Sequence, residues 1–170
     1  LCGLVKLRSP EKVFEFGTFD GRTTENFALN SPESAMVYTL DIEKGSFDFG
    51  SDAHFFKKIT VGECFLSSAL GKKIQMLTGD SKYFDFASFY NTMDFIFIDA
   101  DHSYAGVMND SEKAFAMIRP GGLIVWHDYL MVEDVTRAIL DICKQLNIIN
   151  IKGTKKSLAL TTDCQETSSC

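Results

Sequence analysis

The chain has 170 residues, and its 23 Asp and Glu against 17 Lys and Arg give a formal net charge of −6. Hydrophobic residues make up 45% of the chain, enough for a packed core and too many for a disordered protein. The acidic balance argues against a nucleic-acid partner, because binding nucleic acid needs a basic surface that displaces counterions. No apolar run approaches the roughly 18 residues of a membrane span, so we expect no membrane partner.

The beginning of the chain and its cysteines bear on its location. The first apolar stretch is too short for a signal peptide, and no cleavage site follows it. The cysteines are odd in number and show no C-x-x-C spacing: Cys2, Cys64, Cys143, Cys164 and Cys170. They indicate neither a zinc site nor a disulfide framework, and we expect a cytoplasmic protein.

Short apolar runs alternate with longer mixed segments along the chain. Five runs have the length of buried strands and end at or near an acid or a glycine: 13–16, 37–40, 74–77, 95–98 and 123–126. Apolar residues at helical spacing predict helices between them, at 23–29, 51–70, 107–118 and 135–146. Arg119-Pro120-Gly121-Gly122 should stop the third of these helices. Two last strands, 148–151 and 158–161, are joined by a short turn and should be antiparallel.

Strands that alternate with helices predict a Rossmann-like, doubly wound α/β fold. We expect its sheet to be mostly parallel, with one antiparallel strand near the C-terminus. No repeat or second boundary is visible, so residues 1–161 are expected to form a single domain. Residues 162–170 are polar and small, and are expected to form a frayed tail.

Acidic residues follow the predicted strands, at the edge where a parallel sheet binds its ligands. They are Glu15, Asp41, Asp80, Asp99 and Asp128. Any one of them could cap the next helix, and Asp80 followed by Ser81 fits that interpretation. Five carboxylates at one edge repel one another and need a ligand or a cation to offset them, so the set predicts a binding site.

The turn after the first strand indicates the class of ligand. Gly17 and Gly21 would let the backbone approach a ligand closely, but Phe19 between them does not fit the G-x-G-x-x-G pattern of dinucleotide binders. Acids at 15 and 20, with only Arg22 to offset them, would repel a pyrophosphate. The turn therefore disfavours NAD and ATP and favours a nucleoside without phosphates. The Asp41 carboxylate could accept hydrogen bonds from the ribose hydroxyls of such a nucleoside.

Four segments carry a resemblance to a known family. They are EFGTFDGRTT at 15–24, YTLD at 38–41, DFIFIDADHSY at 94–104 and RPGGLIVWHDY at 119–129. Together they resemble class I S-adenosylmethionine-dependent methyltransferases. The likeness is strongest to the branch with macrocin-type sugar O-methyltransferases and cephalosporin-biosynthesis relatives (methyltransferase domain family 24). It runs from about residue 13 to residue 161.

The resemblance implies a fold and a cofactor site. The sheet would have seven strands in the order 3-2-1-4-5-7-6, the last of them antiparallel. Around S-adenosylmethionine, Glu15, Gly17 and Gly21 would line the methionine part, Asp41 would hold the ribose, and Asp80 with Ser81 would lie by the adenine. The predicted cofactor-binding set also includes Thr18, Phe19 and Asp99. Phe19 is a departure, because many class I enzymes have glycine at that position.

The expected reaction is methyl transfer to a small-molecule acceptor, at a hydroxyl oxygen. A divalent cation can lower the pKa of a hydroxyl, and acids matching Asp99, His127 and Asp128 bind magnesium in metal-using relatives. The histidine at 127 is a softer ligand, so the sequence leaves open whether Mg²⁺, another divalent cation or no metal binds. His102, with Asp99, is the predicted catalytic residue, since imidazole can act as a general base near neutral pH. The alternative interpretation of His102 is that it braces the next helix.

Other functions stay open at this point. The D/N-P-P-Y/F motif of nucleic-acid N-methyltransferases is missing after the fourth strand. A non-catalytic domain that binds S-adenosylmethionine or its product remains possible, and an NAD-dependent oxidoreductase is less favoured. Relatives usually carry N-terminal helices that cover the cofactor, whereas only twelve residues precede the first predicted strand. The chain is therefore expected to be a fragment, or to complete its site as a homo-oligomer.

Overall fold

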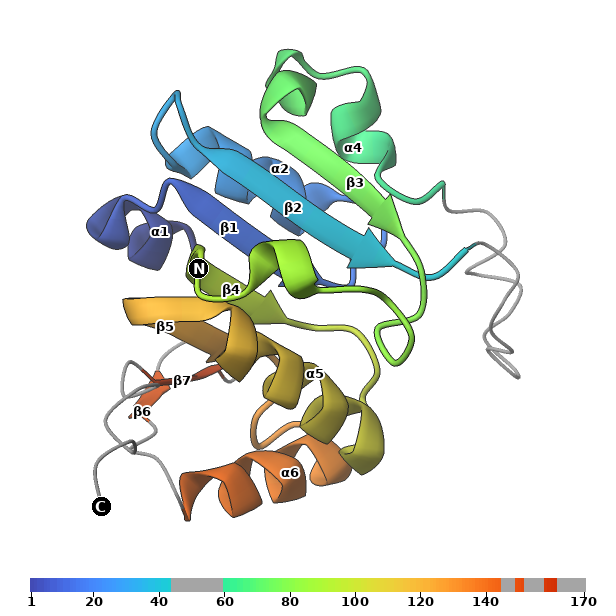
Figure 1. The fold of residues 1–170 in the computed structure, drawn as a ribbon, viewed down its shortest axis with the longest axis vertical. Coiled ribbons are helices and arrows are strands. Elements are labelled where there is room, and N and C mark those ends of the chain that lie inside the picture. The colour runs from blue at the N-terminus through green and yellow to red at the C-terminus, as the bar shows by residue number, and fades with distance from the viewer. Residues whose placement is uncertain (44–59, 145–148, 152–157, 162–170) are drawn as a thin grey trace. The chain divides into compact units, whose positions relative to one another are not determined.

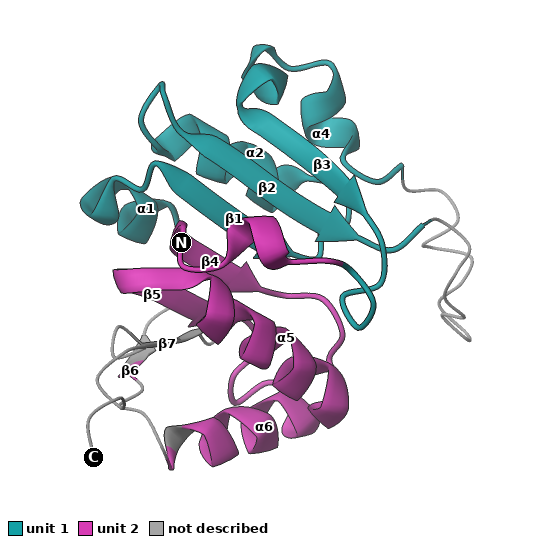
Figure 2. Ribbon diagram, viewed as in Figure 1, with its two compact units in different colours: residues 1–84 teal, residues 85–170 magenta. Residues whose placement is uncertain are grey.

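The computed structural model describes residues 1–43, 60–144, 149–151 and 158–161. It divides the chain into two compact units, Leu1–Phe84 and Asp85–Cys170 (Figure 2). Each unit combines parallel strands with helices, so the predicted, mostly parallel α/β fold is confirmed.

Unit 1 is built on three parallel strands in the order β3-β2-β1 (Figure 1). Their bounds are Lys12–Phe16 for β1, Met36–Asp41 for β2 and Ile74–Thr78 for β3. The helices are α1 at Cys2–Arg8, α2 at Arg22–Asn30, α4 at Glu63–Leu66 and the 3-10 helix η2 at Ala69–Lys73. The α2 helix packs against β2 and β3, and the strands pair in a register that sets Glu15 beside Thr39. The last residues of the three strands therefore lie at one edge.

Unit 2 contains the parallel pair β4 at Met93–Ile98 and β5 at Ile118–Trp126, in which Ile98 pairs with Trp126. The 3-10 helix η3, Ala87–Phe89, precedes β4. Helix α5, Tyr104–Met117, connects the two strands and packs on both of them and on α6, Glu133–Cys143 (Figure 1). The chain closes with β6, Ile149–Ile151, and β7, Leu158–Thr161.

Each unit has its own apolar core, formed by the strand residues that the apolar runs predicted. In unit 1 the buried side chains include Val13, Phe14, Phe27 and Val37. In unit 2 they include Phe95, Ile96, Ile124 and Trp126. Both faces of β1 and β4 are covered, because every residue from 13 to 16 and from 95 to 98 is buried.

Strands β1 to β4 and three of the helices confirm the sequence predictions to within a few residues. The expected helix at 51–70 is only partly described: residues 51–59 lie outside the described part, and the rest holds two short helices with Gly62 at the start of α4. Helix α1 was missed, because its seven residues bury only Val5 and show no apolar face. Residues 119–122, expected only as a stop signal, lie inside β5, which begins at Ile118, and the β4–β5 register shifts between Ile118 and Leu123. The predicted tail, 162–170, lies outside the described residues.

None of the helices that the structure describes is both long enough and apolar enough to cross a bilayer.

Candidate functional site

The glycine turn (residues 17–21) leaves the end of β1 in unit 1. Its backbone is left-handed at Gly17, Phe19 and Gly21, with φ values of 92°, 50° and 83°. At Gly21 a Cβ atom would lie 2.6 Å from the Phe65 ring, so the position excludes any larger residue. Phe19 adopts this uncommon conformation with 42% of its surface exposed. The departure noted in the sequence is therefore accommodated, since the Phe19 side chain is not forced into the core.

Asp41 binds the glycine turn from the end of β2. Its Oδ2 accepts hydrogen bonds from the backbone N–H of Thr18 at 2.9 Å and of Phe19 at 2.8 Å. Its Oδ1 accepts one from the Ile42 N–H at 2.8 Å. A carboxylate offers about four acceptor positions, so these three bonds leave Asp41 able to accept a further donor. Asp41, the residue predicted to bind the ribose, thus also holds the glycine turn in place.

A buried group of hydroxyls lies below the turn, and we call Glu15, Thr18, Thr24 and Thr39 the threonine cluster. Glu15 is fully buried, and its Oε2 accepts hydrogen bonds from the hydroxyls of Thr24 and of Thr39, the latter at 2.6 Å. The Thr39 and Thr18 hydroxyls are 2.7 Å apart. Burying a carboxylate is costly unless partners satisfy it, and the two hydroxyl bonds to Oε2 offset part of that cost at Glu15.

Asp80 and Ser81 follow β3, which pairs with β2 so that Asp41 lies beside Thr78. The Asp80 Oδ1 accepts a hydrogen bond from the Lys82 N–H at 2.9 Å. Its carbonyl accepts from the N–H groups of residues 83 and 84, both at 2.9 Å. Asp80 therefore closes a turn instead of capping a helix, and it stands at the same strand edge as Asp41.

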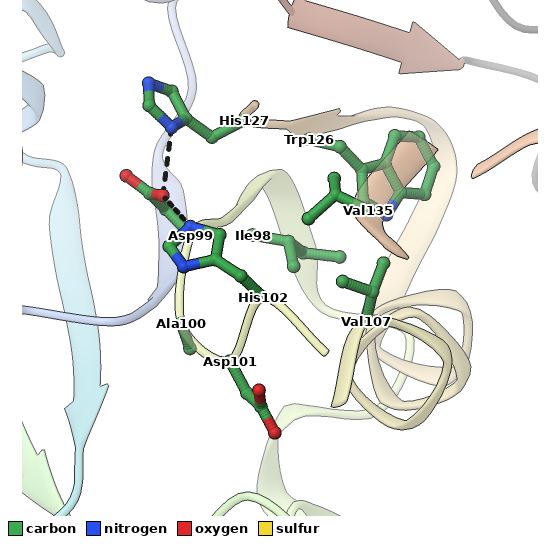
Figure 3. A pocket seen from close by; sticks show the side chains of 9 residues that line it. All are labelled: Ile98, Asp99, Ala100, Asp101, His102, Val107, Trp126, His127 and Val135. Atoms are coloured by element: carbon green, nitrogen blue, oxygen red, sulfur yellow. Dashed lines mark ion pairs between the residues drawn. The ribbon is translucent and has the colours of Figure 1, made fainter. Parts of the chain in front are cut away.

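The second site lies in unit 2 and consists of Asp99, His102, His127 and Asp128, which we call the His–Asp cluster. His127 Nδ1 is 3.0 Å from both Asp99 Oδ1 and Asp128 Oδ2. His102 Nε2 is 3.0 Å from Asp128 Oδ2 and 3.4 Å from Asp99 Oδ1. One potential ligand atom from each residue lies within 4.8 Å of all the others. Figure 3 shows the Asp99 carboxylate between the two imidazole rings.

The strand ends hold three members of this cluster in place. The His127 N–H donates to the Ile98 carbonyl at 3.1 Å, which extends the β4–β5 pairing by one residue. The His127 ring meets the Phe97 ring edge-on, with 5.9 Å between centroids. Asp128 has a left-handed φ of 55°, an uncommon conformation for a residue other than glycine. Such a conformation at a cluster of titratable groups marks this turn as a candidate for function.

His102 is positioned by the loop that opens helix α5. The Asp101 Oδ1 accepts the Ser103 N–H at 2.8 Å, and the Ser103 hydroxyl accepts the Gly106 N–H at 3.1 Å as the helix cap. A Cβ on Gly106 would lie 2.4 Å from the Asp101 carboxyl carbon, so only glycine lets the first turn pass over this loop. The cap is Ser103, and His102 is free of that task.

Burial and ion pairing shift the proton affinities within the His–Asp cluster. Burial raises the pKa of Asp99, but its pairing with both histidines outweighs burial and holds the pKa below its ordinary 3.8. The pairing with Asp99 raises the pKa of His102 above its ordinary 6.5, although burial opposes this. Burial lowers the pKa of His127, yet the pairing with Asp99 raises it overall above 6.5. The cluster therefore favours a charged Asp99 facing protonated imidazoles.

A small cavity of about 10 Å³ adjoins the cluster. Asp99, His102 and His127 line one side of it, and apolar side chains line the other: Ile98, Val107, Trp126 and Val135 (Figure 3). Trp126 is fully buried and donates its indole N–H to the Ser111 hydroxyl at 2.9 Å. Its predicted place in the core is confirmed, and its side chain forms an apolar wall of the cavity.

Comparison with known proteins places the chain in a family. Residues 14–129 match the family model described as "Methyltransferase domain". The chain belongs to this family, which confirms the resemblance seen in the sequence. Among curated relatives, caffeoyl-CoA O-methyltransferase 2 of Populus trichocarpa is 30% identical over 131 residues, covering 75% of this chain and 48% of the relative. A flavonoid 3′,5′-methyltransferase of Vitis vinifera is 27% identical, covering 79% and 54%. The chain spans about half the length of the curated relatives it matches.

Solved structures share the fold across nearly the whole chain. An O-methyltransferase from Bacillus cereus in complex with SAH superposes with a TM-score of 0.64 and 20% identity, covering 94% of this chain and 77% of that one. TomG, an O-methyltransferase from Streptomyces achromogenes in complex with SAM, gives a TM-score of 0.63 and 18% identity, covering 94% and 75%. At these identities the likeness concerns the fold.

Proposed function

We propose that the chain is the catalytic part of an S-adenosylmethionine-dependent methyltransferase that acts on a hydroxyl oxygen of a small-molecule acceptor. The single observation that carries this proposal is the Asp41 carboxylate at the end of β2, which binds the left-handed glycine turn that follows β1. Family membership and the acceptors named for its relatives, caffeoyl-CoA and flavonoids, support the hydroxyl. No nucleic acid or membrane partner is proposed, because the chain is acidic and lacks long apolar runs.

The residues of unit 1 fit an unphosphorylated nucleoside. The cationic side chain nearest to the turn in sequence, Arg22, pairs with Asp20 at 3.2 Å, and its charge is therefore already offset. Asp41 keeps acceptor capacity for ribose hydroxyls, as described above. We propose that Gly17, Thr18, Phe19 and Gly21 form the backbone wall of the cofactor site, with Glu15 holding that wall through the threonine cluster. Asp80 and Ser81 would lie by the adenine.

The residues of unit 2 fit a divalent cation. Two ligand atoms about 2.1 Å from a cation and at right angles to each other are about 3 Å apart. This is the separation of His127 Nδ1 from both the Asp99 and the Asp128 oxygens, 3.0 Å in each case. Asp99, His127 and Asp128 would hold the cation, and a bound cation lowers the pKa of a coordinated hydroxyl.

His102 is proposed as the general base for the acceptor hydroxyl, with Asp99 as its partner. Its side chain is 47% exposed, so an acceptor can reach it, while its Nε2 stays within 3.4 Å of Asp99. The raised pKa of the imidazole strengthens it as a base once it has lost its proton. When bound, the cofactor supplies the electrophilic methyl group. The protein positions the acceptor oxygen and removes the proton of the acceptor hydroxyl.

We further propose that residues 1–161 form one domain whose strands follow the order 3-2-1-4-5-7-6. The antiparallel register in which Val125 faces Leu160 supports the place of the last strand. The likeness to solved methyltransferases over 94% of the chain supports a single domain. A homo-oligomer and a cytoplasmic location complete the proposal, the latter supported by cysteines without paired spacing.

Calorimetric titration tests this function. S-adenosylmethionine and S-adenosylhomocysteine are expected to bind, NAD is not, and Asp41→Ala should abolish the binding. Binding of NAD alone would overturn the proposal. With radiolabelled methyl donor, caffeoyl-CoA and flavonoid hydroxyls serve as probe acceptors. Binding of S-adenosylhomocysteine without turnover on hydroxylated acceptors would favour a non-catalytic domain. Full activity of His102→Gln would exclude the histidine as the base.

A further inference from the structure

The His–Asp cluster offers a cation an imidazole nitrogen as well as carboxylate oxygens. His127 is the most deeply placed of the four, with 9% of its side chain exposed, against 17% for Asp128, 26% for Asp99 and 47% for His102. Its backbone is paired with Ile98 and its ring is packed on Phe97. These contacts hold the His127 Nδ1 3.0 Å from an oxygen of each carboxylate, so a cation bound between the carboxylates lies beside that nitrogen.

The nature of that nitrogen decides which cations fit. Mg²⁺ prefers an octahedron of oxygen ligands and loses its water reluctantly. Imidazole suits first-row transition ions such as Fe²⁺, Co²⁺ and Zn²⁺, for which mixed nitrogen and oxygen ligands are common. Three protein ligands also leave coordination positions open, as catalytic metal sites require.

We infer that the cluster selects a first-row transition ion over Mg²⁺, with His127 as the ligand that sets this preference. The inference rests on the proposed function, since it names the metal class of the same site. His102 is not a ligand in this assignment. It lies on the loop before α5 with nearly half its side chain exposed, and it stays available to the acceptor.

The experiment compares Co²⁺ and Mg²⁺ binding to the metal-free chain by calorimetry, with the visible absorption of bound Co²⁺ as a second readout. Wild type is expected to bind Co²⁺ at least tenfold more tightly than Mg²⁺. His127→Asp should lower the Co²⁺ to Mg²⁺ affinity ratio at least tenfold, and His127→Asn should lose Co²⁺ without gaining Mg²⁺. His102→Gln should keep the Co²⁺ affinity within threefold. Glu112→Gln removes an exposed α5 carboxylate that lies outside the cluster and serves as the matched control.

Equal affinity for the two ions in wild type, or an unchanged ratio in His127→Asp, would overturn the inference. If His102→Gln loses both its affinity for Co²⁺ and the visible absorption of bound Co²⁺, the assignment of His127, and not His102, as the ligand is contradicted. S-adenosylhomocysteine is titrated into the same samples. If it binds while the preference for Co²⁺ is missing, the inference fails and the proposed function stands. If the preference is present while S-adenosylhomocysteine does not bind, the proposed function fails.

Discussion

The two units place acids at the ends of parallel strands and satisfy them with different partners. In unit 1, Glu15 and Asp41 accept hydrogen bonds from hydroxyls and backbone N–H groups, which do not titrate near neutral pH. In unit 2, Asp99 and Asp128 face two imidazoles, and imidazole titrates near neutral pH. The first arrangement fixes the carboxylates against hydroxyls and backbone. In the proposed function, the imidazoles of the second arrangement lose their protons before His127 binds a cation or His102 takes up the acceptor's proton. One feature of the sequence, an acid after a strand, thus yields a hydrogen-bonded turn in one unit and a cluster of titratable groups in the other.

The largest effect is expected from a carboxylate that both histidines share. Asp99→Asn removes the charge that faces His102 and His127, and should lower the affinity for Co²⁺ at least 100-fold, about 2.7 kcal/mol. Calorimetry measures it. Asp101→Asn is the control on the same loop, because the amide oxygen can still accept the Ser103 N–H. An equal loss in both variants would mean that the loop, and not the Asp99 charge, holds the cation.

The second-largest effect is expected from a substitution in the glycine turn. Gly21→Ala places a methyl group 2.6 Å from the Phe65 ring at a φ of +83°. The clash and the strained backbone should lower the free energy of unfolding by about 2–3 kcal/mol. Gly3→Ala is the control: its Cβ meets nothing within 4 Å in helix α1, so it should stabilise by about 0.5–1 kcal/mol. Urea unfolding measures both free energies. An unchanged free energy of unfolding in Gly21→Ala would mean that the close approach of Gly21 to Phe65 does not constrain the turn.

A smaller effect is expected from the threonine cluster. Thr39→Val removes the hydroxyl that donates to the buried Glu15 and meets Thr18. Weakening this buried network should lower the free energy of unfolding by about 1–3 kcal/mol. Thr78→Val, on the exposed side of β3, should change it by less than about 0.5 kcal/mol. Similar results for the two substitutions in chemical denaturation would show that the buried hydroxyl adds nothing to stability.

The smallest effect is a dependence of stability on pH in the metal-free protein. The raised pKa values of His102 and His127 stabilise the folded state fully below pH 6.5, and this is lost as pH rises through the folded values. The lowered pKa of Asp99 stabilises above about 3.8 and is lost as pH falls through its folded value. Unfolding should therefore become easier between pH 6.5 and 8, by on the order of 1 kcal/mol or less because the cluster is partly solvated.

Denaturation midpoints between pH 5 and 8 measure this dependence. His102→Gln and His127→Gln should each flatten this dependence on pH. A protein that becomes more stable from pH 6.5 to 8 would contradict the pairing of protonated imidazoles with the carboxylates.

Much of the fold could be predicted from the sequence, because buried strands need continuous apolar runs. Residues 95–98 and 123–126 show this, and each ends where the structure ends its strand, at Ile98 and Trp126. The α1 helix could not be predicted, since its stability comes from burying one side chain, Val5, and not from a periodic apolar face. The start of β5 was hidden by Pro120 and two glycines, which usually break a strand.

The site was predicted in part. Strand-end acids and His102 were visible as residues, because position after a strand determines the edge at which a side chain lies. Their partners were not visible. Thr39 is an ordinary strand residue, and only the parallel register reveals that it faces Glu15. That one nitrogen of His127 lies 3.0 Å from each of two carboxylates depends on the left-handed turn at Asp128, which no local pattern predicts.

The central claim is that unit 1 binds the nucleoside and unit 2 binds the cation and acts on the acceptor. Titration of S-adenosylhomocysteine into wild type, Asp41→Ala and Asp128→Asn tests it most directly. The account predicts that Asp41→Ala loses binding at least 100-fold, whereas Asp128→Asn keeps it within about threefold while losing Co²⁺. Equal loss of S-adenosylhomocysteine in both variants, or its retention in Asp41→Ala, would contradict the division between the two sites.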